Sequence, residues 1–483
     1  MSFKVKFLHG CCTVSFLMAF TSLSAAGSDI RVAEAVQHRD QQALRSLLKQ
    51  HADVNPPQAD GTTALAWAAH WDDLESADLL IGAGANVNAA NYYGVTALSL
   101  ACTNGSAAMA EKLLKAGANP NAALRTGETP LMTCARTGNA ETVKQLLTHG
   151  ADANTSENQG GQTALMWAVA QKHVDVVRAL IEGGANVHAR SKSGFTPLLF
   201  AARVGDLDSA RLLLQAGEDV NEKTPEGLTP LLVASSSGRF EALATFLLEK
   251  GADPNVADGN GITLLHYGVQ KGISVIGAAA VLMPNQPDLL KALLAHGTNP
   301  NTRIAKDFPP NTRPDYSAKM TLVGATPLLL AAACADVNAM RILADGGANP
   351  LLATKDGVTP LMAVAGIGSE VEGGNSLEAA KLVAELGADV NAADKEGRTA
   401  LHFAASAGAD SIVQLLADKG AKLDVKNKLG QTPLMIAQGD PADKKSAAHP
   451  HKSTASLLLK LGATPVAAPV AQRSEAAPLK SEQ

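Results

Sequence analysis

The chain repeats one arrangement of apolar and polar positions from residue 61 to residue 434. Each repeat opens with Gly-x-Thr-[Pro/Ala/Leu]-Leu, and that leucine heads an apolar segment in which small residues follow, such as Ala68 and Ala69. A second apolar segment with paired leucines, such as Leu113 and Leu114, comes next and ends at Gly-Ala-Asx-x-Asn. The turn and cap residues around both segments predict two short helices and a turn in every repeat.

The spacing of the motif predicts how the repeats are organised. Most steps between successive threonines are 33 or 34 residues, one is 40, and one is 63, which is long enough for a repeat with inserted loops. A period of this size is typical of a linear array of stacked units, and not of a globule around one core. The eleven motif threonines are Thr63, Thr96, Thr129, Thr163, Thr196, Thr229, Thr263, Thr326, Thr359, Thr399 and Thr432.

The residues at the helix boundaries have physical reasons. The glycine two positions before each threonine suits a tight turn with a positive φ angle, and the threonine hydroxyl can cap the first helix. Proline follows threonine in six repeats, at the first helical position, where no N–H is needed. Glycine usually ends the first helix, as at Gly105, and another glycine caps the second, as at Gly84.

Two stretches resemble ankyrin repeats: Gly-Arg-Thr-Ala-Leu-His-Phe-Ala-Ala at 397–405 and Gly-Ala-Asp-Ala-Asn at 150–154. The resemblance covers about residues 30–463. It implies an all-α fold, an α-solenoid of about 11 helix-turn-helix repeats with β-hairpin tips, preceded by a degenerate N-terminal capping unit. The histidine that usually follows the leucine is kept only as His266 and His402, and we interpret both as structural.

The two ends of the array differ from its interior. The segment before the first motif lacks the threonine signature and carries polar residues, as expected of a solubilising cap. The last residues have too little apolar surface to fold. The predicted organisation is a signal peptide at 1–26, the capping repeat at 27–60, ankyrin repeats at 61–301 with an insertion at 273–286, an inserted loop at 302–323, ankyrin repeats at 324–463 and a disordered tail at 464–483.

Residues 1–26 have the pattern of a secretory signal peptide. Two lysines precede an apolar run from Cys11 to Phe20, and a Ser-Ala-Ala sequence ends at Ala26, where we expect cleavage. The expected location is the periplasm of a Gram-negative bacterium, with release outside the cell as an alternative. A lipoprotein site at Cys11 is disfavoured because the apolar run follows the cysteine. A retained anchor is disfavoured because the run is short of the roughly 20 residues of a membrane span.

The net charge bears on the kind of partner, and the positions of the cysteines bear on disulfide bonding. Cleavage would remove two lysines and no acids, so the formal charge would change from −5 to −7, which speaks against general nucleic-acid binding. Cys102 and Cys134 occupy small-residue positions of adjacent repeats. Helices roughly 8–10 Å apart would hold their Cα atoms beyond bridging distance, so no disulfide is predicted. Cys334 is interpreted as a half-buried small side chain.

The chain contains no His-Glu-x-x-His, no Gly-x-x-x-x-Gly-Lys-[Ser/Thr] and no Gly-x-Ser-x-Gly sequence. We therefore predict no catalytic residues, no cofactor and no metal. His449 and His451 lack a second pair of ligands, so they are weak evidence for a metal site. An undetected enzymatic or small-molecule site near the 273–323 insertions stays an alternative.

Recognition of another protein is the predicted function. The resemblance implies that hairpin tips and the last residues of the first helices form the contact surface, and Trp, Tyr and Arg are typical of interface hot spots. Trp71 could equally cover the thin N-terminal end of the core, while Trp67 and Trp167 are predicted to be core residues. The predicted partner-binding residues are His70, Trp71, Tyr92, Tyr93, Arg136, Arg203, Lys271, Phe308, Arg313 and Tyr316.

The chain is thus expected to be a monomeric, non-catalytic interaction scaffold. It would bind a partner protein of unknown identity through its concave face and the 302–323 loop, with no nucleic acid and no membrane span in the mature chain. Two further alternatives stay open. One is a secreted effector that acts on a host protein. The other is a membrane-surface protein, provided that the apolar segment 273–283 is exposed to solvent.

Overall fold

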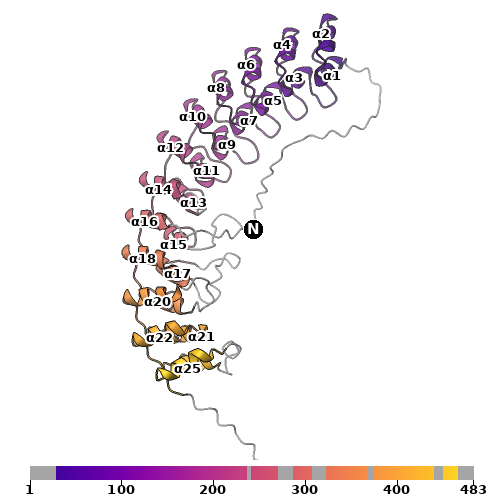
Figure 1. Cartoon of the computed structure of the whole chain (residues 1–483). Coiled ribbons are helices and arrows are strands. Elements are labelled where there is room, and N and C mark those ends of the chain that lie inside the picture. Colours follow the sequence, from indigo (N-terminus) through magenta and orange to yellow (C-terminus); the bar gives the residue numbers. More distant parts are fainter. Residues whose placement is uncertain are drawn as a thin grey trace, which may run out of the picture. The chain divides into compact units, whose positions relative to one another are not determined.

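The computed structural model describes residues 29–236, 241–269, 287–306, 322–366, 375–439 and 450–465. These residues form two compact units, 29–256 and 257–465, each built from helices joined by turns (Figure 1). Within the described ranges no extended strand is present, which agrees with the predicted all-α fold. The predicted signal peptide, the 273–286 insertion, most of the 302–323 loop and most of the tail lie outside the described residues.

The helices of the first unit alternate between the first and the second helix of a repeat. They are α1 (Arg31–Gln37), α2 (Gln41–Lys49), α3 (Ala64–His70), α4 (Leu74–Gly82), α5 (Ala97–Asn104), α6 (Ala107–Lys115), α7 (Pro130–Thr137), α8 (Ala140–Thr148), α9 (Ala164–Ala170), α10 (Val174–Glu182), α11 (Pro197–Val204), α12 (Leu207–Gln215), α13 (Pro230–Ser236) and α14 (Glu241–Glu249).

The second unit follows the same alternation. Its described helices are α15 (Leu264–Val269), α16 (Pro287–Ala295), α17 (Pro327–Ala333), α18 (Val337–Asp345), α19 (Pro360–Ala365), α20 (Ser376–Glu385), α21 (Ala400–Ala407), α22 (Asp410–Asp418), α23 (Pro433–Gln438) and α25 (Lys452–Lys460).

Each helix packs mainly against its repeat partner and the equivalent helix of the next repeat. In the first unit, α3 contacts α1, α4 and α5, and α6 contacts α4, α5 and α8. The first helices of this unit lie on the inner side of an arc and the second helices on its outer side (Figure 1). We call the surface formed by α1, α3, α5, α7, α9, α11 and α13, with the turns that precede them, the first-helix face.

The predicted threonine caps are present. The hydroxyl of Thr63 accepts the N–H of Ala66 at 3.3 Å, and Thr129 accepts that of Met132 at 3.3 Å. Each threonine has an extended backbone before a helix, so its side chain satisfies an N–H group that has no partner inside the helix. These caps fix where the first helix of each repeat begins.

The two histidines of the motif are buried parts of the same caps. His266 Nδ1 accepts the N–H of Thr263 at 3.1 Å, so its Nε2 carries the proton and donates to the carbonyl of Ala325 in the next repeat at 3.3 Å. His402 likewise links Thr399 to Gln431. Burial lowers the pKa of both rings, that of His266 to about 4. This confirms their structural interpretation.

The asparagine that ends Gly-Ala-Asx-x-Asn joins neighbouring repeats, a role that the sequence did not reveal. Asn121 Nδ2 donates to the carbonyl of Gly150 at 2.9 Å, and Asn121 Oδ1 accepts the N–H of Asp152 at 2.8 Å. His188 and Leu351 occupy this position in two other repeats. The same pair of bonds is made by Asn55, Asn88, Asn154, Asn221, Asn301 and Asn391.

The predicted hairpin tips are turns with little strand character. Four of them contain one isolated β-bridge each, such as the bridge between Ala90 and Thr96. Backbone hydrogen bonds join adjacent tips. For example, the N–H of Tyr92 donates to the carbonyl of Asp60 at 3.1 Å. A Cβ atom on Gly61, whose φ is +88°, would lie 3.0 Å from Asn91 Cα, so this close approach requires glycine.

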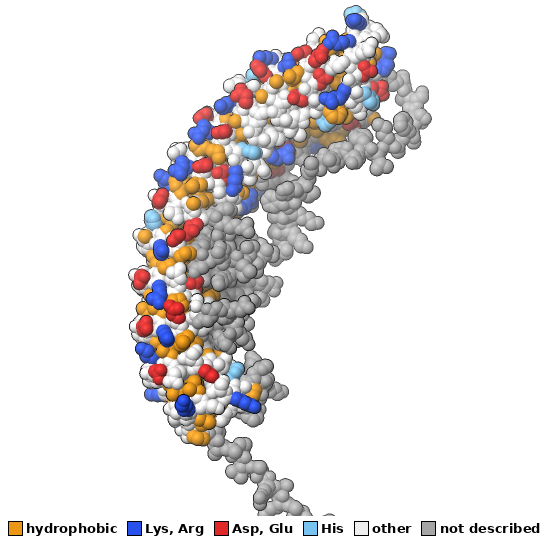
Figure 2. Space-filling view, in the orientation of Figure 1, with side chains coloured by type: hydrophobic (Ala, Val, Ile, Leu, Met, Phe, Trp, Pro, Cys, Tyr) orange, Lys and Arg blue, Asp and Glu red, His pale blue; other side chains and the backbone are white. Residues whose placement is uncertain are grey.

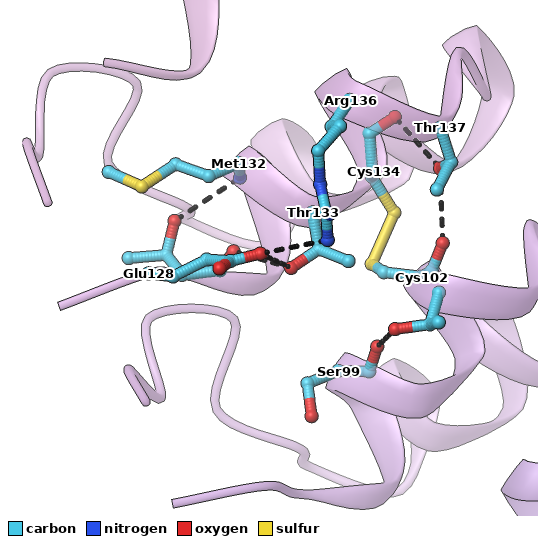
Figure 3. Close-up of polar contacts among 10 residues, drawn as sticks. Ser99, Cys102, Glu128, Met132, Thr133, Cys134, Arg136 and Thr137 are labelled. Atoms are coloured by element: carbon cyan, nitrogen blue, oxygen red, sulfur yellow. Dashed lines mark hydrogen bonds and ion pairs between the residues drawn. A yellow bond between two sulfur atoms is a disulfide. The ribbon is translucent and has the colours of Figure 1, made fainter. Parts of the chain in front are cut away.

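The prediction that no disulfide forms is wrong. Cys102 in α5 and Cys134 in α7 are bonded, with their Cα atoms 4.7 Å apart (Figure 3). The separation of helix axes overstates the distance between two residues that face each other across the interface. Small side chains, such as Ala101 and Ala135, are fully buried beside the cysteines and let the two backbones approach. Cys334 follows α17 and is half-buried, as predicted.

Candidate protein-binding surface

Three aromatic side chains are exposed close together in the sequence of the first unit. Trp71 follows α3, and Tyr92 and Tyr93 form the tip of the next turn; their exposed fractions are 37%, 62% and 68%. We call these three residues the N-terminal aromatic patch. The N–H of Tyr93 donates to Asn91 Oδ1 at 3.0 Å, and its carbonyl accepts the N–H of Arg125 at 3.2 Å. The backbone of the tip is therefore held while both phenol rings stay exposed.

Trp71 combines the two roles that the sequence left open. Its indole N–H donates to the carbonyl of Gln37 in the capping unit at 3.2 Å, and its ring lies 6.3 Å from that of Trp67. The guanidinium of Arg39 lies 5.3 Å from the ring centroid. His70, also predicted as a contact residue, meets Trp71 edge-on at 4.6 Å. Trp71 thus covers the end of the array and still exposes more than a third of its surface.

The prediction that Trp67 and Trp167 are core residues is wrong, because both are half-buried. Leu330 at the equivalent position is fully buried. Burial at this position varies between repeats, since Phe200 is buried and Leu100 is half-buried. Trp67 Nε1 donates to Gln58 Oε1 at 2.8 Å.

Arg136 and Arg203 lie on the first-helix face, as predicted, and each stacks on an aromatic ring. The guanidinium of Arg136 is 5.4 Å from the ring centroid of Trp167, and it pairs with Glu128 at 3.3 Å (Figure 3). The guanidinium of Arg203 is 4.5 Å from the ring of Phe200 and 5.4 Å from that of Phe195. Such stacking holds an arginine in place while its N–H groups remain able to bind a ligand.

The remaining predicted contact residues, Lys271, Phe308, Arg313 and Tyr316, lie outside the described residues and stay predictions. One described residue of the inserted loop, Arg303, donates to the carbonyl of Ala353 in the next turn at 3.1 Å.

The second helices present a different surface. Figure 2 shows cationic and anionic side chains interspersed along their edge. Neighbouring repeats are paired there, as between Lys112 and Asp78 at 2.7 Å and between Arg341 and Glu378 at 3.1 Å. Such exposed pairs contribute little stability, and they offer no aromatic anchor. Of the helices in the described ranges, none has the length and apolarity to cross a membrane.

These observations define a helical repeat scaffold that presents side chains from successive turns and first helices. A family model for ankyrin repeats, described as "Ankyrin repeats (3 copies)", matches residues 32–124, 116–191, 198–304 and 369–467. The chain belongs to the ankyrin-repeat family.

Similar proteins share segments of the repeat array. The chain is 38% identical over 97 residues to the ankyrin repeat and KH domain-containing protein mask of Drosophila melanogaster. This alignment covers 20% of this chain and 2% of that protein. It is 37% identical over 79 residues to serine/threonine-protein kinase 12 of Arabidopsis thaliana, covering 14% of this chain and 17% of the kinase. The chain thus spans a small part of the length of these relatives.

Two solved structures are similar in fold. They are the ankyrin repeat domains of Bcl-3 and of human ASB11, each 28% identical with a TM-score of 0.41. Each alignment covers 46% of this chain and 99% or 98% of the other.

Proposed function

We propose that this chain is a non-catalytic scaffold that binds a partner protein through the first-helix face of its first unit. Ankyrin repeats generally mediate protein–protein interaction. The observation that carries the proposal is the N-terminal aromatic patch, in which Trp71, Tyr92 and Tyr93 are exposed on a held backbone. Because the backbone that carries them is already ordered, and tyrosine and tryptophan have few rotatable bonds, these aromatic side chains lose little conformational freedom when they bind a partner.

The experiment is affinity capture with the mature chain as bait. The Tyr92→Ala/Tyr93→Ala double variant should capture at least about tenfold less partner, because each hot-spot aromatic contributes on the order of 2 kcal/mol. Adding Trp71→Ala should remove the remainder. The matched control is Leu351→Ala/Leu429→Ala, since these residues are 57% and 75% exposed on turns of the second unit. Equal capture by the aromatic variants and the wild type would contradict the proposal.

We also propose export to the periplasm. The signal-peptide pattern of residues 1–26 supports it, and the Cys102–Cys134 disulfide fits an oxidising compartment. Fractionation should find a chain that begins at Gly27 in the periplasmic extract. A mature chain confined to the culture supernatant would favour the secreted effector instead.

The inserted loop is proposed as a second contact, because it carries Phe308, Arg313 and Tyr316 among prolines. Phe308→Ala/Tyr316→Ala should then weaken capture without abolishing it. Unchanged capture would leave partner binding to the first-helix face alone.

A further inference from the structure

We propose that α7, α9 and α11 bind an acidic peptide segment of the partner protein, through a platform made of Arg136, Trp167 and Arg203. The inference rests on the proposed protein-binding function and adds the chemistry of the bound segment. The three residues come from the first helices of three successive repeats, since α9 contacts both α7 and α11. They therefore form a row along the first-helix face.

Arg203 supplies the strongest reason for an anionic ligand. Its side chain is exposed, and its guanidinium lies over the rings of Phe195 and Phe200. No carboxylate of the described residues pairs with it, in contrast to Arg136. A guanidinium held on aromatic rings without a counter-charge is well suited to bind a carboxylate with two parallel hydrogen bonds.

Trp167 supplies an independent reason to expect a bound peptide at this platform. The indole N–H groups of Trp67 and Trp71 both donate to acceptors inside the protein, to Gln58 and to the carbonyl of Gln37. The indole N–H of Trp167 has no acceptor in the described part of the chain, although the ring is half-buried. This N–H is not sealed inside the protein, so it is available to an acceptor that a ligand brings, such as a peptide carbonyl or a carboxylate.

Arg136 completes the platform. Its partner Glu128 also accepts the Thr133 hydroxyl at 2.8 Å, so this acid is held within its own repeat (Figure 3). Arginine has five N–H donors, and one contact with Glu128 leaves several for a ligand. Neighbouring first helices lie roughly 8–10 Å apart, which equals about three residues of extended peptide. Arg136 and Arg203 are two repeats apart, because α9 lies between α7 and α11, so acids about six residues apart would meet both.

The test uses the mature chain and three synthetic peptides of equal length. The acidic probe has four Glu-Gly-Ser units, the second has Gln in place of every Glu, and the third has Lys. Fluorescence anisotropy should show saturable binding of the acidic probe alone, weakened by added salt because exposed charges are screened. Arg203→Gln should lower its affinity about tenfold, the loss expected for a bidentate charge-assisted pair.

The matched control is Arg211→Gln. Arg211 also stacks on a phenylalanine, at 4.8 Å from the ring of Phe246, but it belongs to the second helix α12. This variant should bind the acidic probe like the wild type. In the ¹⁵N-labelled protein, the indole N–H resonance of Trp167, assigned with Trp167→Phe, should shift on binding, while those of Trp67 and Trp71 stay in place. The shift itself is measured in the wild-type protein, and Trp167→Phe serves only to assign the resonance.

Several results would overturn the inference: equal binding of the glutamine peptide, unchanged affinity of Arg203→Gln, a static Trp167 resonance, or no saturation at millimolar peptide. Tighter binding of a single-stranded oligothymidylate than of the acidic peptide would assign the platform to nucleic acid instead. The capture experiment separates the two proposals. If partner capture is lost in the aromatic-patch variant and kept in Arg203→Gln, the scaffold function stands and the acidic segment is refuted.

Discussion

Cys102 and Cys134 connect the first helices of two adjacent repeats by a disulfide that closes a loop with a sequence separation of 32 residues (Figure 3). The bond reduces the conformational entropy of the unfolded chain. We therefore expect reduction to lower the free energy of unfolding by about 3 kcal/mol. Denaturant unfolding with and without dithiothreitol measures the difference. The Cys102→Ser/Cys134→Ser double variant is the control, because reductant should not change its unfolding. Thiol labelling under denaturing, non-reducing conditions should modify only Cys334 in the mature chain; modification of all three cysteines would contradict the bond.

The error about this disulfide shows where sequence reasoning reached its limit. The period of the motif predicted an array of helical repeats, and the threonine and glycine positions predicted helix caps that the structure confirms, such as Thr63 and Gly105. The distance between Cys102 and Cys134 depends on how closely two particular helices pack, which the buried Ala101 and Ala135 decide. This distance is set by how α5 and α7 pack together, so the sequence of either repeat alone does not reveal it.

A second prediction concerns a buried carboxyl group. Glu218 stands where most repeats have alanine, is 5% exposed, and accepts the N–H of Leu198 at the start of α11 at 3.2 Å. Burial raises its pKa from 4.5 to about 7, against the opposing effect of the hydrogen bonds from Thr196 and Leu198. The folded state therefore favours the protonated form. Stability should be highest below pH 4.5 for this group and should fall as the pH rises toward about 7.

Glu218→Gln removes the charge and keeps an acceptor for the N–H of Leu198. We expect the variant to unfold like the wild type near pH 4 and to be more stable at pH 8, by on the order of 2–3 kcal/mol. Thermal unfolding across this pH range measures the effect. Glu226→Gln, an exposed change on the following turn, serves as the control and should leave the pH profile unaltered. Parallel profiles of Glu218→Gln and the wild type would refute a protonated Glu218.

The candidate surface was predictable only in part. The resemblance and the repeat register placed His70, Trp71, Arg136 and Arg203 at the ends of first helices, and they lie at or next to the ends of α3, α7 and α11. The repeat register could not show that Trp167 is half-buried, since residues at the same position range from the fully buried Leu330 to the half-buried Leu100. Which side chains find partners across repeats depends on their size and on the neighbouring unit.

The asparagine bonds between repeats lead to the last prediction. Leu351 occupies the position of Asn121 and is 57% exposed, so replacing it loses little buried surface. In Leu351→Asn the new amide can bond the carbonyl of Gly387 and the N–H of Asp389, the counterparts of Gly150 and Asp152. Two added hydrogen bonds should raise the free energy of unfolding by about 1 kcal/mol, since each contributes roughly 0.5–1.5 kcal/mol net.

The reciprocal variant Asn121→Ala should lose a similar or larger amount, because it leaves the two backbone groups of the next repeat without their partner. The Leu351→Ala variant is the control, because it removes the exposed leucine without adding an amide. Urea unfolding of the three variants tests the account. A Leu351→Asn chain no more stable than Leu351→Ala would show that the asparagine follows from turn geometry and does not join the repeats.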